Sequence, residues 1–182
     1  KLAYEVRERN YDLVVVDASA TGHVVGQLAS PVAMKELVSV GIVRQQTEWM
    51  LNILTDPAQT GVVVVATPEE MPVNETIELI DRLDSETDIN VAAVIANRVL
   101  PELFSRDEEV AFDQLDAEPG RAALASLLGE GADLVVDAAR LAADLRRSRA
   151  VHLANLASRL PDTVPLVNVP YPAAIKGFFG DF

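Results

Sequence analysis

Four short runs of almost purely apolar residues constrain the fold of this chain more than any other feature. They are rich in valine and isoleucine, none alternates cleanly between polar and apolar residues, and they span Leu13 to Val16, Val62 to Ala66, Val91 to Ala96 and Val164 to Val169. This pattern is typical of strands buried on both faces, as in a parallel sheet between helices. The runs therefore predict a mainly parallel sheet covered by helices on both faces.

The segments between these runs have helical spacing. Residues 72–84 place four apolar side chains on one face, namely Val73, Ile77, Ile80 and Leu83. Residues 31–61, with a break at Gly41, and residues 106–160 are helical by pattern and carry no strand signal. Strands that alternate with helices build βαβ units, so we expect one α/β domain over residues 1–182, with a helical insertion at 31–61 and a helical segment at 106–160. Because sheets of this kind usually have about five or six strands, we expect an incomplete sheet.

Composition excludes several classes of protein. The chain has 182 residues, no cysteine, and 15 lysine and arginine residues against 28 aspartate and glutamate residues, a net charge of −13. It can therefore form no disulfide, thiolate metal site or cysteine nucleophile, and its acidity argues against nucleic acid as a partner. The apolar runs are far shorter than the roughly 18 residues that cross a bilayer, so we expect no transmembrane segment and a cytoplasmic location.

Polar residues or a turn follow each predicted strand. The four endings are Asp17, Thr67 to Glu70, Asn97 with Arg98, and Pro170 with Tyr171. Ligands of open parallel sheets bind at the carboxyl ends of the strands, so these positions are candidates for a binding site. In nucleotide-binding proteins, a strand that ends in a single aspartate often supplies the carboxylate that holds Mg²⁺ beside the nucleotide. Many other strands end in an aspartate that only caps a helix or forms a turn.

Several motifs, in order, resemble a known family. DASATGH follows the first run, TDP precedes the second, TPEEMPVNET opens a helix, and ANRVLP and VPYPAAIKG come later. Together they are similar to the arsenite-pump and tail-anchored-protein-targeting ATPases, and most of all to actinobacterial members. The resemblance spans most of the chain and is weakest over residues 106–160. It implies a P-loop nucleoside triphosphatase-like fold of the deviant Walker A class.

The resemblance also implies roles for individual residues. Asp17 would lie near Mg²⁺ and the attacking water, and Thr21, Gly22 and His23 would form a phosphate-sensing switch. Asn97 would read the adenine edge, and the base would be flanked by Pro170 and Tyr171. The chain departs from the family loop at Ala18, Ser19 and Ala20, and Gly26 stands where the family often has an arginine. These departures imply a switch that moves differently or that hydrolyses ATP slowly.

Plainer interpretations exist for some of these residues. His23 could be a surface histidine, and Asn97 could be a turn residue at a strand end. The arginine cluster of the 106–160 segment resembles an anion site, but a solvated helix face paired with Asp137 and Asp144 is favoured. This cluster comprises Arg140, Arg146, Arg147 and Arg149.

A P-loop of the form G-x-x-x-x-G-K-[ST] is absent from the sequence. In the family this loop lies upstream of every motif found here, so we expect the C-terminal portion of a longer ATPase that is inactive by itself. The leading hypothesis is an ATP- and Mg²⁺-dependent switch that works as a homodimer or paralogous heterodimer with an unidentified protein client. A second is a non-catalytic nucleotide-binding or dimerisation subunit. A third is an unrelated enzyme that uses Asp17 and His23 as an acid–base pair.

Overall fold

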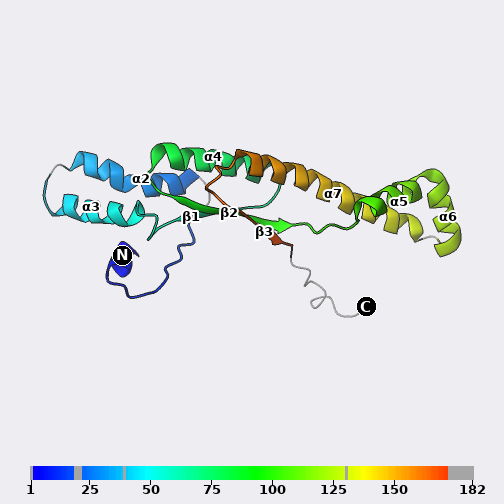
Figure 1. Cartoon of the computed structure of the whole chain (residues 1–182), viewed down its shortest axis with the longest axis horizontal. Helices are drawn as coiled ribbons and strands as arrows, with labels where there is room; N and C mark the ends of the chain where they lie inside the picture. The colour runs from blue at the N-terminus through cyan, green and yellow to red at the C-terminus, as the bar shows by residue number, and fades with distance from the viewer. Residues whose placement is uncertain (1, 19–21, 39, 130, 172–182) are drawn as a thin grey trace.

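A three-stranded parallel sheet forms the centre of the molecule (Figure 1). The structure is a computed structural model and describes residues 2–18, 22–38, 40–129 and 131–171. The strands are β1 (Val62–Ala66), β2 (Val91–Val99) and β3 (Leu166–Pro170), and they pair in the order β1-β2-β3. Three of the four apolar runs therefore form strands, and the predicted α/β class with a parallel, incomplete sheet is confirmed.

The first apolar run does not form a strand. Residues 13–18 have no regular secondary structure, and the side chains of Leu13, Val15 and Val16 are exposed. A strand needs a neighbour to accept and donate its backbone hydrogen bonds, and nothing in the described ranges pairs with this run. The prediction of a strand over Leu13 to Val16 is therefore wrong for this structure, although the run has the right composition.

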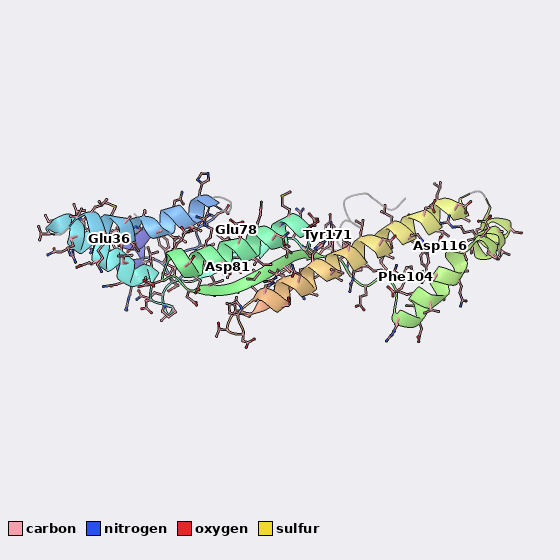
Figure 2. All side chains as sticks on the ribbon, turned by 90° about the horizontal axis from the view of Figure 1, so that it is seen from above. Glu36, Glu78, Asp81, Phe104, Asp116 and Tyr171 are labelled. Atoms are coloured by element: carbon pink, nitrogen blue, oxygen red, sulfur yellow. The ribbon has the colours of Figure 1, made fainter. Side chains whose placement is uncertain are left out.

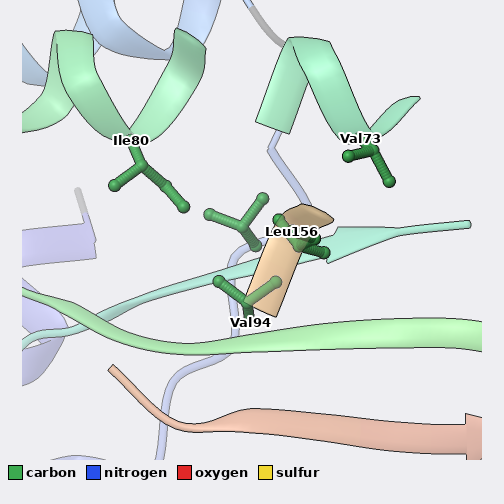
Figure 3. Close-up of a cluster of buried hydrophobic side chains, with 5 residues drawn as sticks. Val73, Ile80, Val94 and Leu156 are labelled. Atoms are coloured by element: carbon green, nitrogen blue, oxygen red, sulfur yellow. The ribbon is translucent and has the colours of Figure 1, made fainter. Parts of the chain in front are cut away.

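The main core lies between the sheet and two helices, α4 (Glu70–Glu86) and α7 (Ala132–Arg159) (Figure 3). It is built from β-branched and leucine side chains that interlock across these elements: Val64, Val73, Ile80, Val94 and Leu156. In α4 the predicted periodicity is confirmed, because Val73, Ile80 and Leu83 are buried. The helix begins after Glu69, whose side chain makes no capping hydrogen bond.

In the described part of the chain, helices pack on only one face of the sheet. The sequence pattern predicted helices on both faces. Figure 1 shows α4 and α7 on the same side of the strands. Along β1, Val64 and Ala66 are buried beneath these helices, while Val63 and Val65 are 50% and 58% exposed on the other face. A strand with apolar residues at every position fits burial on both faces, but only half of its side chains are covered here.

Helices also project beyond both sides of the sheet (Figure 1). On one side, α2 (Gly22–Leu37) and α3 (Ile42–Leu54) form a pair joined at Gly41, which adopts the left-handed φ of 100° at the predicted break. α1 (Leu2–Arg7) reaches this pair through the Arg7 guanidinium, which lies 4.9 Å from the centroid of the Trp49 ring. Residues 31–61 are thus mainly helical, as the pattern predicts.

On the other side lies the helical extension, which comprises α5 (Arg106–Asp116), α6 (Glu118–Leu128) and residues 132–147 of α7. Figure 2 shows α7 running from the sheet to this region. The corner between α5 and α6 requires Gly120, because a Cβ there would come within 2.5 Å of the carbonyl oxygens of Gln114 and Leu115. Three helices therefore occupy the stretch that the sequence predicted to be helical.

None of the helices in the described part of the chain combines sufficient length with sufficient hydropathy to span a bilayer. This includes α7, whose 28 residues carry charged side chains along their whole length.

Candidate functional site

The carboxyl end of β2 is irregular at the point where the sequence placed a site residue. Ala96 pairs with Asn168 of β3 and Val99 pairs with Pro170, so two β2 residues oppose one β3 residue, and this forms a β-bulge. Arg98, in the bulge, has a φ of 59°, a left-handed conformation that a non-glycine residue rarely adopts. The Asn97 Oδ1 atom accepts a hydrogen bond of 2.9 Å from the Arg98 N–H. Bulges and left-handed residues concentrate at functional sites, which marks this strand end as a candidate.

The end of β3 lies directly beside this bulge. The Tyr171 N–H donates a hydrogen bond of 2.8 Å to the Val99 carbonyl and so ties the residue after β3 to the last residue of β2. Tyr171 itself is partly exposed and is labelled in Figure 2. The structure therefore brings Asn97, Pro170 and Tyr171 to the ends of neighbouring strands. Side chains alternate between the two faces of a strand, and Ala96 is buried, so the next residue, Asn97, lies on the face that the helices leave uncovered. Pro170 pairs with Val99, beyond the bulge.

The end of β1 connects the same edge of the sheet to α7. A tight turn follows this strand, in which the Glu69 N–H donates to the Thr67 carbonyl at 2.8 Å and Pro68 is buried. The Glu69 carboxylate then accepts a hydrogen bond of 2.8 Å from the Arg149 guanidinium. Because Arg149 belongs to α7, this ion pair links the strand ends to the helix that carries the helical extension.

The predicted switch segment is only partly described. Asp17 is exposed in the irregular segment that precedes α2, so no strand carries its carboxylate to the sheet edge. Gly22 and His23 form the first turn of α2, and His23 is exposed. Thr21 lies outside the described residues. The roles assigned to these residues, and those assigned to Asn97, Pro170 and Tyr171, remain predictions.

The described residues offer few clustered oxygen or nitrogen ligands for a metal ion. No group of three or more histidine, aspartate or glutamate side chains is arranged around a possible metal position within the described ranges. Mg²⁺ in nucleotide sites needs only one or two protein carboxylates, since water and phosphate complete its shell, so Asp17 alone is compatible with it. A carboxamide beside a proline and an aromatic residue likewise suits a planar base with polar edges.

The arginines of α7 form ion pairs, which agrees with the favoured interpretation of this cluster, although only one of the two predicted carboxylates pairs with it. Arg147 does contact Asp144, with Nη1 and Oδ1 3.3 Å apart. Asp137, however, pairs with Arg121 of α6 at 2.6 Å. The other three arginines of the cluster reach across to separate elements: Arg140 to Asp116, Arg146 to Glu102 and Arg149 to Glu69.

Sequence reasoning missed two residues at this edge. Arg98 carries the left-handed conformation of the bulge, but a single arginine after an asparagine gives no sequence signal for it. Arg149 was assigned to a solvated helix face, yet its partner Glu69 lies 80 residues away in the chain. Its pairing depends on the docking of α7 against the sheet, which local spacing does not encode.

The chain is similar to one protein family and to several individual proteins. The family model described as Anion-transporting ATPase matches residues 39–115. The chain is 33% identical to ATPase BagA of Mycobacterium tuberculosis over 116 residues, which are 63% of this chain and 34% of that protein. It is 24% identical to an ATPase ASNA1 homolog of Entamoeba dispar over 133 residues, 56% of this chain and 40% of that protein. The chain thus spans well under half the length of these relatives.

Proposed function

Because this chain belongs to the anion-transporting ATPase family, we propose that it supplies the switch segment and the adenine-binding edge of an ATP-hydrolysing switch protein. The observation that carries the proposal is the convergence of Asn97, Pro170 and Tyr171 at the carboxyl ends of β2 and β3. Open parallel sheets bind ligands at this edge. The bulge next to Asn97 and the edge position of all three residues support this proposal.

Asn97 would select the base. Its Oδ1 atom is already oriented by the Arg98 N–H, so the two amide hydrogens of the side chain remain as donors toward a ring nitrogen. A carboxamide offers donors and an acceptor in one plane, which matches the mixed edge of adenine. Pro170 and Tyr171 would contact the faces of the ring and exclude water from it.

Asp17 and His23 would act on the phosphate side. When bound, Mg²⁺ neutralises charge that develops on the transferred phosphoryl group. The Asp17 carboxylate would hold a water molecule of the metal shell and orient the attacking water. His23 and Gly22 begin α2, so a change in their contacts with the terminal phosphate would move that helix. Two such chains, identical or paralogous, would open and close around nucleotide and act on an unidentified client.

The test is the substitution Asp17→Asn in the full protein that contains this chain. We expect Mg²⁺-dependent phosphate release to fall by about 100-fold or more while ATP still binds, because an amide cannot replace the carboxylate in charge. Asp12→Asn is the matched control, since Asp12 is an exposed aspartate just upstream in the same segment and should leave the rate unchanged.

Two outcomes would decide against the proposal. Phosphate release by Asp17→Asn at the parental rate would exclude this carboxylate from hydrolysis. If the unchanged protein binds ATP, with or without a paralogous partner, but releases no phosphate, the chain is instead a non-catalytic nucleotide-binding subunit. The substituted residues of the switch segment, Ala18 to Ala20, are the observation that favours this second function.

A further inference from the structure

The first half of α7 has two apolar faces, and the larger side chains are on the exposed one. Toward α6 and α5, this half buries three small residues, Ala132, Val136 and Ala143. On the outside, Leu134, Leu141 and Leu145 are 74%, 62% and 45% exposed. A helix that packs on one side only normally places its leucines against the core and its alanines toward solvent. This inversion indicates that the outer face also packs against something.

The exposed leucines form a continuous strip along the helix. Together with the exposed Ala138 they stand at positions 134, 138, 141 and 145, a spacing of four, three and four residues. At about 100° per residue, these side chains fall within one narrow sector on the side opposite Val136 and Ala143. We call this set the α7 stripe. Its three-and-four spacing is that of a seam between two helices, so the shape that fits it is another helix.

The charges beside the α7 stripe identify the kind of helix. One flank carries three aspartates, namely Asp133, Asp137 and Asp144. Two arginines partly neutralise them: Arg121 is 2.6 Å from Asp137 and 3.8 Å from Asp133, and Arg147 is 3.3 Å from Asp144. The flank therefore retains net negative charge, within a chain of net charge −13. The opposite flank begins with Val135 and Ala142 and continues toward the sheet with Arg146 and Arg149, which pair with Glu102 and Glu69.

These charges disfavour an antiparallel second copy of the chain as the occupant. An antiparallel pair of α7 helices would set Leu134 opposite Leu145, but it would also bring Asp137 of one copy toward Asp144 of the other. Like charges in that arrangement destabilise a pair. A helix with basic residues along one edge would instead find complementary charge.

We propose that the α7 stripe docks an amphipathic helix of a partner protein, with leucine-like residues on its inner face and lysine or arginine along one flank. The apolar face would provide most of the affinity, because exposed leucines leave water on both partners. The basic flank would set the orientation and accelerate association. The stripe uses none of the nucleotide-site residues, so this proposal does not depend on the proposed ATPase function.

The experiment uses the full protein that contains this chain, together with defined helical probes. A fluorescein-labelled peptide about 18 residues long, long enough for helix formation, carries leucines three and four apart and lysines along one flank. A second peptide has glutamates in place of the lysines, and a third has the first composition in scrambled order. Fluorescence anisotropy gives the dissociation constant of each. We expect the leucine–lysine peptide to bind at least about tenfold more tightly than either of the others.

Variants of the chain locate the binding. Leu134→Gln with Leu141→Gln should weaken the leucine–lysine peptide by about tenfold or more, since both leucines face solvent and their removal leaves the fold intact. Circular dichroism checks that intactness. Val151→Gln is the matched control, because Val151 is an exposed residue of the same helix that lies off the stripe. Equal binding of all three peptides, no binding at millimolar concentration, or equal loss in the control would overturn the proposal.

Sedimentation velocity tests the alternative occupant. We expect the association state of the chain to be the same with and without the two substitutions. If the parent chain is a dimer that Leu134→Gln with Leu141→Gln converts to a monomer, the stripe is a contact between copies and the proposal of a partner helix is wrong.

Discussion

The two ends of α7 are held in place by different interactions. Near the sheet, Leu156 is almost completely buried and packs in a cluster of aliphatic side chains from β1, β2 and α4. In the helical extension, α7 buries only small side chains, and ion pairs join the helices: Asp116 of α5 pairs with both Arg121 of α6 and Arg140 of α7. Large aliphatic side chains therefore contribute more at the sheet end of this helix, and ion pairs contribute more at the other end. Apolar packing is insensitive to pH, whereas ion pairs are not, so the two ends should respond differently to the same perturbation.

The largest expected effect is at the sheet. Leu156→Ala would leave a cavity among Val64, Val73 and Val94 and should lower the free energy of unfolding by about 3 kcal/mol. Urea denaturation followed by circular dichroism measures this change. Leu141→Ala is the control on the same helix, because Leu141 is exposed and its truncation should cost little. A loss for Leu156→Ala no larger than that for Leu141→Ala would show that the sheet end does not depend on this cluster.

The next effect concerns the charge cluster and pH. Burial of Asp116 opposes ionisation of its carboxyl group, but hydrogen bonds from Arg121 and then Arg140 outweigh this and hold its pKa below the usual value. The reciprocal interaction with Asp137 and Asp116 raises the pKa of Arg121. A lowered folded-state pKa contributes stability that is complete above the unfolded-state value of about 3.9 and is lost as the pH falls through the folded-state pKa. The helical extension should therefore loosen in acid before the sheet does.

Asp116→Asn tests this directly. At pH 7 we expect faster amide hydrogen exchange across residues 106–147 and unchanged exchange across residues 62–99. At acid pH, where Asp116 of the parent is protonated, the difference in helical content between parent and variant should disappear. Asp113→Asn is the matched control, because Asp113 is more exposed and lies 3.6 Å from Arg140. Uniform acceleration over both regions would contradict the separation of the two ends.

The smallest effect is at the start of α5. Ser105 and Glu108 form a capping box, in which the Ser105 N–H donates to the Glu108 carboxylate at 2.7 Å and Ser105 Oγ accepts from the Glu108 N–H at 3.4 Å. Ser105→Ala should cost about 1 kcal/mol of local stability, visible as faster exchange at the first turn of α5. Ser126→Ala, at an exposed position in α6, should not change that exchange. Equal exchange in the two variants would mean that ion pairs alone fix this end of the helix.

The candidate site was only partly predictable from sequence. The ends of β2 and β3 were found because each strand is an apolar run that stops at a polar residue or a proline, a signal contained within a few residues. The bulge at Arg98 was not found, because it arises from the register between two strands. The Leu13 to Val16 run has a strand's composition, yet its conformation depends on whether another strand lies beside it.

The sequence by itself determined three of the four predicted strands and the main helical segments, because the period of apolar residues decides locally which side chains leave water. It also indicated the resemblance to the anion-transporting ATPases, through motifs that keep their order along the chain. The tertiary structure alone decided that helices cover one face of the sheet, that Arg149 pairs with Glu69 and Asp137 with Arg121, and that Leu134, Leu141 and Leu145 of α7 are exposed. These features depend on contacts between residues that are far apart in the chain. Such contacts form only after the helices and strands have packed, so no local sequence pattern predicts them.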